Sequence, residues 1–166
     1  VTIIDLLVRA GVEVVTAGLE AGPVTASRGV VLLPRTTLDD ALNRDYDMVV
    51  LPGGMPGAAN LDNDPRIHQL LRRMAGSGKF IAAICAAPRV LANAGLLSGK
   101  RATSYPGHLD KMDLPDVEYC RESVVRDGKV ITSRGPGTAM DFTLSLIELL
   151  VGREKRDEVE AGLMRG

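Results

Sequence analysis

The sequence predicts an α/β fold with an open, mostly parallel sheet and helices on both faces. Three short apolar runs support this prediction, at residues 12–17, 46–54 and 79–85. Each run ends in Gly, Pro or a helix start, and none alternates between apolar and polar residues, so all three suit strands that are buried on both faces. Helical patterns lie between the runs, and this alternation is typical of a sheet whose ligands gather at the carboxyl ends of its strands.

Capping signals and amphipathic patterns place the other elements in order. We expect helices at residues 3–11, which end in Gly, and at residues 64–78, which begin with an Asp cap followed by Pro. Residues 120–133 predict two strands joined by an Asp-Gly turn, which is a strong hairpin signal. A long helix is expected at residues 135–152, and a shorter, highly charged one at residues 153–166.

Length, composition and charge limit the classes of protein to consider. The 166 residues, of which 45% are hydrophobic and 25% charged, predict a single globular domain over residues 1–166. A net charge of -1 and 3% aromatic residues argue against a nucleic-acid partner. The chain has no apolar run long enough to span a bilayer and no secretory signal pattern at its start, so we expect no membrane contact and a cytoplasmic location.

Cys85 lies where the apolar run of residues 79–85 meets a helical pattern. Pro88 near the first turn and Gly95 after the last turn mark the limits of that helix. A helix N-terminus favours a thiolate and stabilises an oxyanion beside it, and the alanines around Cys85 permit the tight corner of a nucleophile elbow. A lone cysteine can equally be a small buried hydrophobe, so spacing alone leaves both interpretations open.

Two other strand ends carry Gly-rich turns. Gly53 and Gly54 follow an apolar run, where their N–H groups form either half of an oxyanion hole or a simple turn. Arg134 precedes a Gly-Pro-Gly turn and a helix, which places it either facing an anion or at a surface or subunit contact. An α/β sheet brings such strand ends to one edge, so we expect the two turns to lie near Cys85.

A nucleophilic cysteine usually needs a base or a charged partner, and the chain has two histidines. His68 lies inside a helical pattern, where we expect a solvated or packed side chain. His108 follows the turn at Tyr105 and is a candidate site residue. Cys120 lies in a strand pattern with no helix behind it, which predicts packing or incidental exposure rather than catalysis. The spacing of these cysteines and histidines fits no metal site, so we expect no metal.

Three stretches, in this order, resemble the ThiJ/PfpI superfamily and, within it, the parkinsonism-associated deglycase (DJ-one) branch. They read VVLPGGMPGAANL, IAAICAAPRVLANAGLLSGKRATSYP and VITSRGPGTAMDFTLSLIELLVG, and the likeness runs from Val1 to about Val159. The resemblance implies a flavodoxin-like three-layer α/β sandwich, with a mostly parallel sheet and helices on both faces. It also implies a homodimer and a reactive cysteine at the elbow.

The resemblance assigns roles to individual positions. It implies that Cys85 is the nucleophile and oxidation site, that the N–H groups of Gly54 and Ala86 are the oxyanion donors, and that Gly53 shapes their loop. It further implies that two arginines lie near the site or the dimer contact, namely Arg28 and Arg134.

The sequence also departs from the pattern of these relatives. In the protease-like branch a histidine directly follows the cysteine, but Ala86 stands here, which argues against a protease-type Cys-His pair. Some deglycase-branch members carry a histidine where Tyr105 stands, and His108 is not an aligned substitute. The glutamate that hydrogen-bonds the cysteine in this branch lies two positions before the residue matching Val1. We therefore expect the domain to lack its N-terminal strand and this glutamate.

The resemblance implies a cofactor-independent, cysteine-dependent enzyme of the glyoxalase or deglycase type. Its substrates would be α-oxoaldehydes such as methylglyoxal and glyoxal, or early glycation adducts, in carbonyl and oxidative stress defence. The alternative is a non-catalytic redox sensor or redox-regulated chaperone that uses an oxidisable Cys85. A glutaminase-like hydrolase would need a histidine and carboxylate pair after the cysteine, for which His108 is the one candidate histidine.

Overall fold

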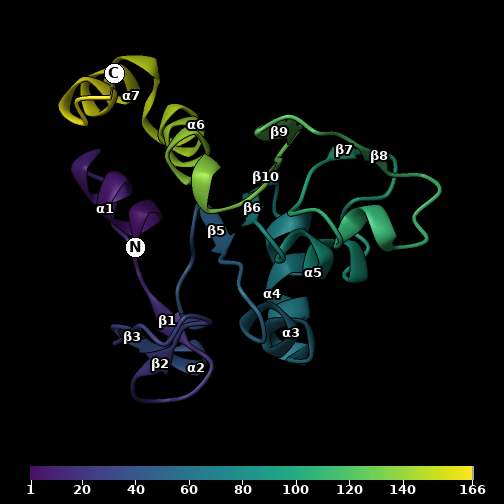
Figure 1. Cartoon of the computed structure of the whole chain (residues 1–166). Helices are drawn as coiled ribbons and strands as arrows, with labels where there is room; N and C mark the ends of the chain where they lie inside the picture. The colour runs from purple at the N-terminus through teal and green to yellow at the C-terminus, as the bar shows by residue number, and fades with distance from the viewer. Residues whose placement is uncertain (166) are drawn as a thin grey trace.

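A four-stranded sheet lies at the centre of the computed structural model, which describes residues 1–165 (Figure 1). Its strand order is β5-β6-β10-β9, in which β5, β6 and β10 are parallel and β9 is an antiparallel outer strand. The strands are β5 (Met48–Leu51), β6 (Phe80–Ile84), β9 (Val124–Asp127) and β10 (Val130–Ser133). The sheet is therefore mixed but mostly parallel, as the apolar runs and the Asp-Gly turn predict.

Helices cover both faces of this sheet and make it the middle of three layers. On one face lie α4 (Pro65–Gly76) and α5 (Pro88–Asn93), and on the other lie α1 (Thr2–Arg9), α6 (Ala139–Val151) and α7 (Arg153–Gly162). A separate apolar cluster fills each interface. This is the predicted α/β architecture, with β6 as an inner strand that contacts both clusters.

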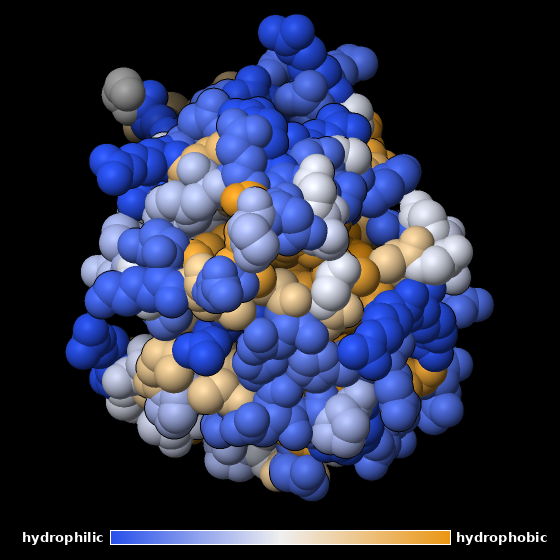
Figure 2. All heavy atoms as spheres, turned by 90° about the vertical axis from the view of Figure 1, so that its right-hand side faces the viewer, coloured by the Kyte–Doolittle hydropathy of each residue, from blue (hydrophilic) through white to orange (hydrophobic). Residues whose placement is uncertain are grey.

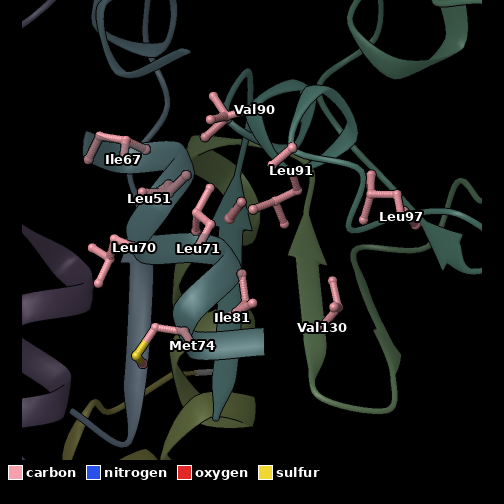
Figure 3. Close-up of a cluster of buried hydrophobic side chains, with 14 of the residues drawn as sticks. Leu51, Ile67, Leu70, Leu71, Met74, Ile81, Val90, Leu91, Leu97 and Val130 are labelled. Carbon is pink, nitrogen blue, oxygen red and sulfur yellow. The ribbon is translucent and has the colours of Figure 1, made fainter. Parts of the chain in front are cut away.

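The side chains of β6 alternate between the two clusters. Ile81 and Ala83 belong to the cluster under α4 and α5, which Figure 3 shows in close-up, whereas Ala82 and Ile84 belong to the cluster under α1 and α6. All four residues are buried. Each face of β6 near Cys85 therefore carries one small and one branched side chain, all packed between the helical layers.

Short elements complete the fold. Two small parallel pairs and one antiparallel pair of strands lie outside the central sheet, together with two short helices and two 3₁₀ turns. They are β1 (Ala17–Gly18) with β4 (Thr36–Thr37), β2 (Val24–Thr25) with β3 (Val31–Leu32), β7 (Arg101–Ala102) with β8 (Glu118–Tyr119), α2 (Leu38–Ala41), α3 (Gly57–Asp62), η1 (Leu109–Lys111) and η2 (Pro136–Thr138).

The capping signals in the sequence predicted the helix ends well. The Asp64 carboxylate accepts a hydrogen bond from the backbone N–H of Arg66 at 2.9 Å, as expected of an N-cap residue, and Pro65 is the first residue of α4. Gly11 ends α1 with a φ of 76°, in the left-handed region that glycine favours. These local signals act within one or two turns, so they are readable without the rest of the fold.

The strand predicted at residues 12–17 is wrong over most of its length. Only Ala17 lies in a strand, β1, because residues 12–16 have no paired strand beside them among residues 1–165. At the end of this segment the Thr36 N–H donates a hydrogen bond to the carbonyl of Thr16 at 3.1 Å, next to the β1–β4 pair. An extended apolar segment becomes a strand only where a neighbour supplies the hydrogen bonds.

The surface is largely hydrophilic. Figure 2 shows the side of the molecule that lies on the right in Figure 1, where polar and charged side chains predominate and apolar ones gather near the middle. Within residues 1–165, every helix is too short or too polar to cross a membrane.

Candidate functional site

Cys85 is the first residue after β6, at the corner between this strand and α5. Its φ of 66° lies in the left-handed region, which non-glycine residues adopt rarely and at a cost of about 1–3 kcal/mol. Hydrogen bonds fix the backbone there: the Cys85 N–H donates to the carbonyl of Ser133 at 3.0 Å, and its own carbonyl accepts from the Tyr105 N–H at 2.8 Å. The side chain is half-buried and packs against the apolar cluster under α6. The predicted tight corner is therefore present, held by the last residue of β10 and by the segment after β7, and the nucleophilic role of its thiol stays a prediction.

Gly53 lies directly against this corner. A Cβ at this position would lie 2.4 Å from Cβ of Cys85 and 2.8 Å from the carbonyl oxygen of Ile84, both far inside contact distance. The same Cβ would lie 3.2 Å from the nitrogen of Ala86. A residue without a side chain is therefore required here, because the strand end after β5 touches the elbow backbone itself.

Gly54 and Ala86 contribute the N–H groups that were predicted as oxyanion donors. Gly54 has a φ of 88°, a left-handed conformation, and its carbonyl accepts from the N–H of Ala58 to start α3. Within residues 1–165, the N–H groups of Gly54 and Ala86 donate to no backbone carbonyl. In this described part of the chain, the two N–H groups therefore lack backbone partners on either side of the contact between Gly53 and the Cys85 corner, and their role as oxyanion donors stays a prediction.

The loops after β7 and β10 close the other side of the corner. A Cβ on Gly135 would lie 3.2 Å from the ring carbon Cδ2 of Tyr105, so the loop after β10 contacts this half-exposed ring. Arg134 donates from Nε to the carbonyl of Ser104 at 3.5 Å and from Nη1 to that of Arg121 at 3.3 Å. Arg134 therefore ties these loops together, and its predicted role as a supporting residue remains a proposal.

His108 lies on the Tyr105 loop and is half-buried. Its ring meets that of Tyr105 edge-on, with centroids 6.4 Å apart at 65°. Burial, and then the positive charge of Arg89, lower the pKa of His108 below its usual value near 6.5, with a smaller opposing effect from Asp110. Both effects favour the neutral imidazole on the loop that holds the Cys85 corner.

Arg28 lies in the turn between β2 and β3 and is exposed. Its neighbour Ser27 reaches the site: a Cβ on Gly54 would lie 3.2 Å from Oγ of Ser27. The turn that carries Arg28 is therefore close to the candidate oxyanion donors, although the side chain that approaches them is that of Ser27.

The remaining histidine and cysteine lie elsewhere. His68 Nε2 lies 2.8 Å from the carbonyl of Asp62 and 3.1 Å from its Oδ1, so it is a hydrogen-bonded, packed residue of α4. Cys120 is buried immediately after β8. No group of three or more His, Cys, Asp or Glu within residues 1–165 is arranged to hold a metal ion.

Sequence analysis did not single out Arg89, which lies four residues after Cys85 in the first turn of α5. Its Nε is buried and lies 3.9 Å from Oδ2 of Asp62 at the end of α3. A charged residue in the first turn after a nucleophile elbow was a visible signal. The groups around Arg89 come from α3 and from the loop that carries His108. The position of Arg89 in the sequence does not reveal these neighbours.

The protein has a mostly parallel α/β sheet, and a cysteine in a left-handed conformation lies at a strand-to-helix corner with a glycine turn against it. These features define a flavodoxin-like α/β protein with a cysteine at the end of an inner strand. The chain belongs to the DJ-1/PfpI family, which it matches over residues 1–149. Its relatives include protein dj-1beta of Drosophila melanogaster, 46% identical over 162 residues, or 96% of this chain and 86% of that protein. The Parkinson disease protein 7 homolog of Danio rerio is 43% identical over 97% of this chain and 87% of its own length.

A third relative carries an activity in its name. The glutathione-independent glyoxalase DJR-1.2 of Caenorhabditis elegans is 39% identical over 93% of this chain and 82% of its own length. Among solved structures, Drosophila melanogaster DJ-1beta superposes with a TM-score of 0.94 at 44% identity, covering 99% of this chain and 89% of that one. The oxidized Toxoplasma gondii DJ-1 gives 0.93 at 38% identity, covering 99% and 90%. The fold and family predicted from the sequence are confirmed.

Proposed function

We propose that this protein is a cysteine-dependent glyoxalase that converts α-oxoaldehydes such as methylglyoxal and glyoxal to lactate and glycolate, with related action on early glycation adducts. The observation that carries this proposal is the Cys85 corner: a half-buried thiol in a left-handed conformation, with Gly53 against it and two N–H groups unused by the backbone. The relative named as a glutathione-independent glyoxalase supports the same activity.

The proposed reaction begins with addition to the aldehyde. The Cys85 thiolate attacks the aldehyde carbon of methylglyoxal, and the N–H groups of Gly54 and Ala86 stabilise the oxyanion of the hemithioacetal. The aldehyde carbon then loses its proton and the neighbouring carbon gains one, which gives a lactoyl thioester. Water hydrolyses this thioester, releases lactate and restores the thiol, so no electrons are gained or lost overall. In the branch that the chain resembles, this proton transfer is assigned to the glutamate that hydrogen-bonds the cysteine.

The test is lactate formation from methylglyoxal under steady-state conditions by the full-length protein. We expect many turnovers from the unmodified protein and a loss of at least about a thousandfold in the Cys85→Ala variant, because the covalent step disappears. Cys120→Ala is the matched control and should retain full activity. A folded protein that forms no lactate, or a Cys85→Ala variant that forms it at the normal rate, would contradict the proposal.

The second candidate function is redox sensing or redox-regulated chaperone activity. The half-buried thiol of Cys85 is open to oxidation to sulfenic and sulfinic acid, and the structure of the Toxoplasma gondii relative is of an oxidized form. A sensor is consumed stoichiometrically whereas an enzyme regenerates its cysteine. The turnover number in the lactate assay therefore separates the two functions.

We also propose that the chain forms a homodimer. The hairpin of β2 and β3 exposes a group of large apolar side chains, which a second copy would remove from water. They are Val24, Val30, Val31, Leu32 and Leu33. Light scattering should give twice the chain's mass of 17.6 kDa, and the monomer mass at micromolar concentration would refute the dimer.

A further inference from the structure

Two buried nitrogen atoms near the elbow have no hydrogen-bond partner. They are Nε of Arg89 and Nδ1 of His108, and neither finds an acceptor or donor within residues 1–165. Proteins pair nearly all buried polar nitrogens with protein atoms, water or a ligand, because an unpaired one loses its hydration without replacement. Two such atoms, on segments that meet at the Cys85 corner, therefore point to a group that pairs with them.

Both nitrogens belong to segments that form the elbow. Arg89 lies in the first turn of α5, and its backbone N–H donates to the carbonyl of Ala86 at 3.4 Å. His108 lies three residues after Tyr105, whose backbone N–H donates to the carbonyl of Cys85 at 2.8 Å and whose ring contacts the imidazole. The charge of Arg89 acts on the imidazole strongly enough to lower the pKa of His108. The two side chains therefore interact through charge and lie on the segments that form the Cys85 corner.

The carboxylate nearest to Arg89 is already engaged by other groups. Asp62 Oδ2 lies 3.9 Å from Nε of Arg89, too far for a hydrogen bond. It accepts instead from the side-chain amide of Asn93 at 2.6 Å, while Oδ1 of Asp62 lies 3.1 Å from Nε2 of His68. Asp62 therefore orients Arg89 electrostatically and leaves its Nε–H without an acceptor.

The carboxylate on the other side is engaged as well. Asp110 acts on His108 through its charge, but its Oδ1 accepts from the backbone N–H of Gly107 at 2.7 Å. The ring of Tyr105 offers His108 an edge contact and no hydrogen bond. Nδ1 of His108 therefore stays without a partner from the loop that carries it.

We propose that Arg89 and His108 form a carboxylate-binding subsite beside Cys85. One carboxylate oxygen accepts from Nε–H of Arg89 and the other from Nδ1–H of His108, in the tautomer that carries its proton on Nδ1. Its ligands are small carboxylates, which include the 2-hydroxy acid formed in the proposed reaction and aldehydes that carry an acid group. The proposal rests on the proposed function for the choice of ligand, but carboxylate binding can be measured without turnover.

The first test compares two alkylating reagents in a Cys120→Ala background. The Cys85 thiolate attacks the CH2 carbon of iodoacetate or iodoacetamide, so that an S–C bond forms, the C–I bond breaks and iodide is released. Only iodoacetate carries a carboxylate next to the reacting carbon. We expect the ratio of the two rates to fall roughly five- to tenfold in Arg89→Gln and in His108→Gln, because each variant removes one charged or polar donor. Arg72→Gln, which changes an exposed arginine of α4, is the matched control and should leave the ratio unchanged.

The second test measures lactate binding to the Cys85→Ser variant by NMR titration. Arg89→Gln should weaken binding roughly five- to tenfold, while Arg72→Gln should not. Unchanged rate ratios, or lactate that binds equally well with and without Arg89, would overturn the subsite and leave the two nitrogens to bound water. A Cys85 that reacts with neither reagent would count against the proposed function, while lactate binding would still decide the subsite.

Discussion

Cys85 and Cys120 are the two cysteines of the chain, and their surroundings differ in backbone, exposure and hydrogen bonding. Cys85 has a φ of 66°, is half-buried and has a bare glycine turn against it. Cys120 is 8% exposed, its Sγ donates to the carbonyl of Glu118 at 3.5 Å, and its N–H donates to that of Ala102 at 2.8 Å. Cys85 therefore has an unfavourable backbone conformation and lies near N–H groups without backbone partners in the part of the chain that the structure describes. Cys120 is a packed residue whose thiol and N–H are hydrogen-bonded.

The difference between the two cysteines indicates which position of the fold is suited to chemistry. A residue in a rare conformation persists only when its surroundings force it there, and such positions cluster at sites where geometry matters for chemistry. Around Cys85 the forcing contacts come from three strand ends, after β5, β7 and β10. Cys120 is buried, and both its thiol and its backbone N–H have hydrogen-bond partners, which is typical of a structural residue.

The largest expected effect is on thiol reactivity. At pH 7.5 a disulfide reagent such as DTNB should react with Cys85 at least about a hundredfold faster than with Cys120, because a buried thiol reacts only through opening of the structure. Stopped-flow absorbance should show one fast thiol in the native protein and a second after denaturation. The Cys85→Ala variant should lose the fast phase, and Cys120→Ala should lose the slow one.

If Cys120 reacts as fast as Cys85, the contrast between the two sites fails. A fast phase that persists in Cys85→Ala would point to the same conclusion, because it would have to come from Cys120.

The next effect concerns the glycine that lies against the elbow. Gly53→Ala places a Cβ at 2.4 Å from Cβ of Cys85, and the neighbouring backbone at Ile84 cannot yield easily. We expect a loss of about 2–3 kcal/mol in the free energy of unfolding, measured in urea, and loss of most of the glyoxalase activity because the elbow shifts.

The control for this variant is Gly57→Ala in α3. A Cβ at Gly57 has no protein atom within 4 Å, so this change adds a methyl group without a clash. It should keep full activity and change stability by less than about 1 kcal/mol. Equal effects of the two variants would show that the close approach of Gly53 to the elbow has no consequence.

Much of the fold is readable from local signals in the sequence. The Asp64 cap, the Asp-Gly hairpin and the Gly-bounded helices each act through a few neighbouring residues, and all are confirmed. The strand expected at residues 12–17 is wrong because a strand needs a partner, and partners are set by topology rather than by local composition. Pattern analysis therefore predicts buried strands and capped helices better than it predicts outer segments.

The candidate site could be predicted only in part, because some of its residues meet only through tertiary contacts. Cys85 and its glycines could be proposed because they occupy strand ends, and parallel strands bring their ends together. Arg89 was missed because its importance lies in the loop of His108 and the end of α3, which approach it only in the folded chain. Ser27 was missed for the same reason, since the turn that carries it reaches Gly54 from far away in sequence.

The smallest expected effect is a pH dependence from the Cys85 neighbourhood. Burial and then Arg89 lower the pKa of folded His108 below the value near 6.5 that it has in the unfolded chain. Well above pH 6.5 the imidazole is neutral in both states and contributes nothing to the pH dependence. As the pH falls from 6.5 through the lower folded value, the unfolded chain takes up the proton first, so stability falls.

Urea unfolding at pH 7.5 and pH 5.5 measures this contribution. The loss of stability between these two values should be smaller in His108→Gln than in the unmodified protein. An equal loss in both proteins would show that His108 titrates alike in the folded and unfolded states.

Strand β6 ends at the Cys85 corner and also separates the two apolar clusters. Its amides are paired on both sides, with β5 and with β10, and its side chains anchor alternately in each half of the interior. Amide protons in such a strand exchange with solvent only when the whole domain unfolds. The cysteine at its end is therefore attached to the part of the chain that we expect to open last.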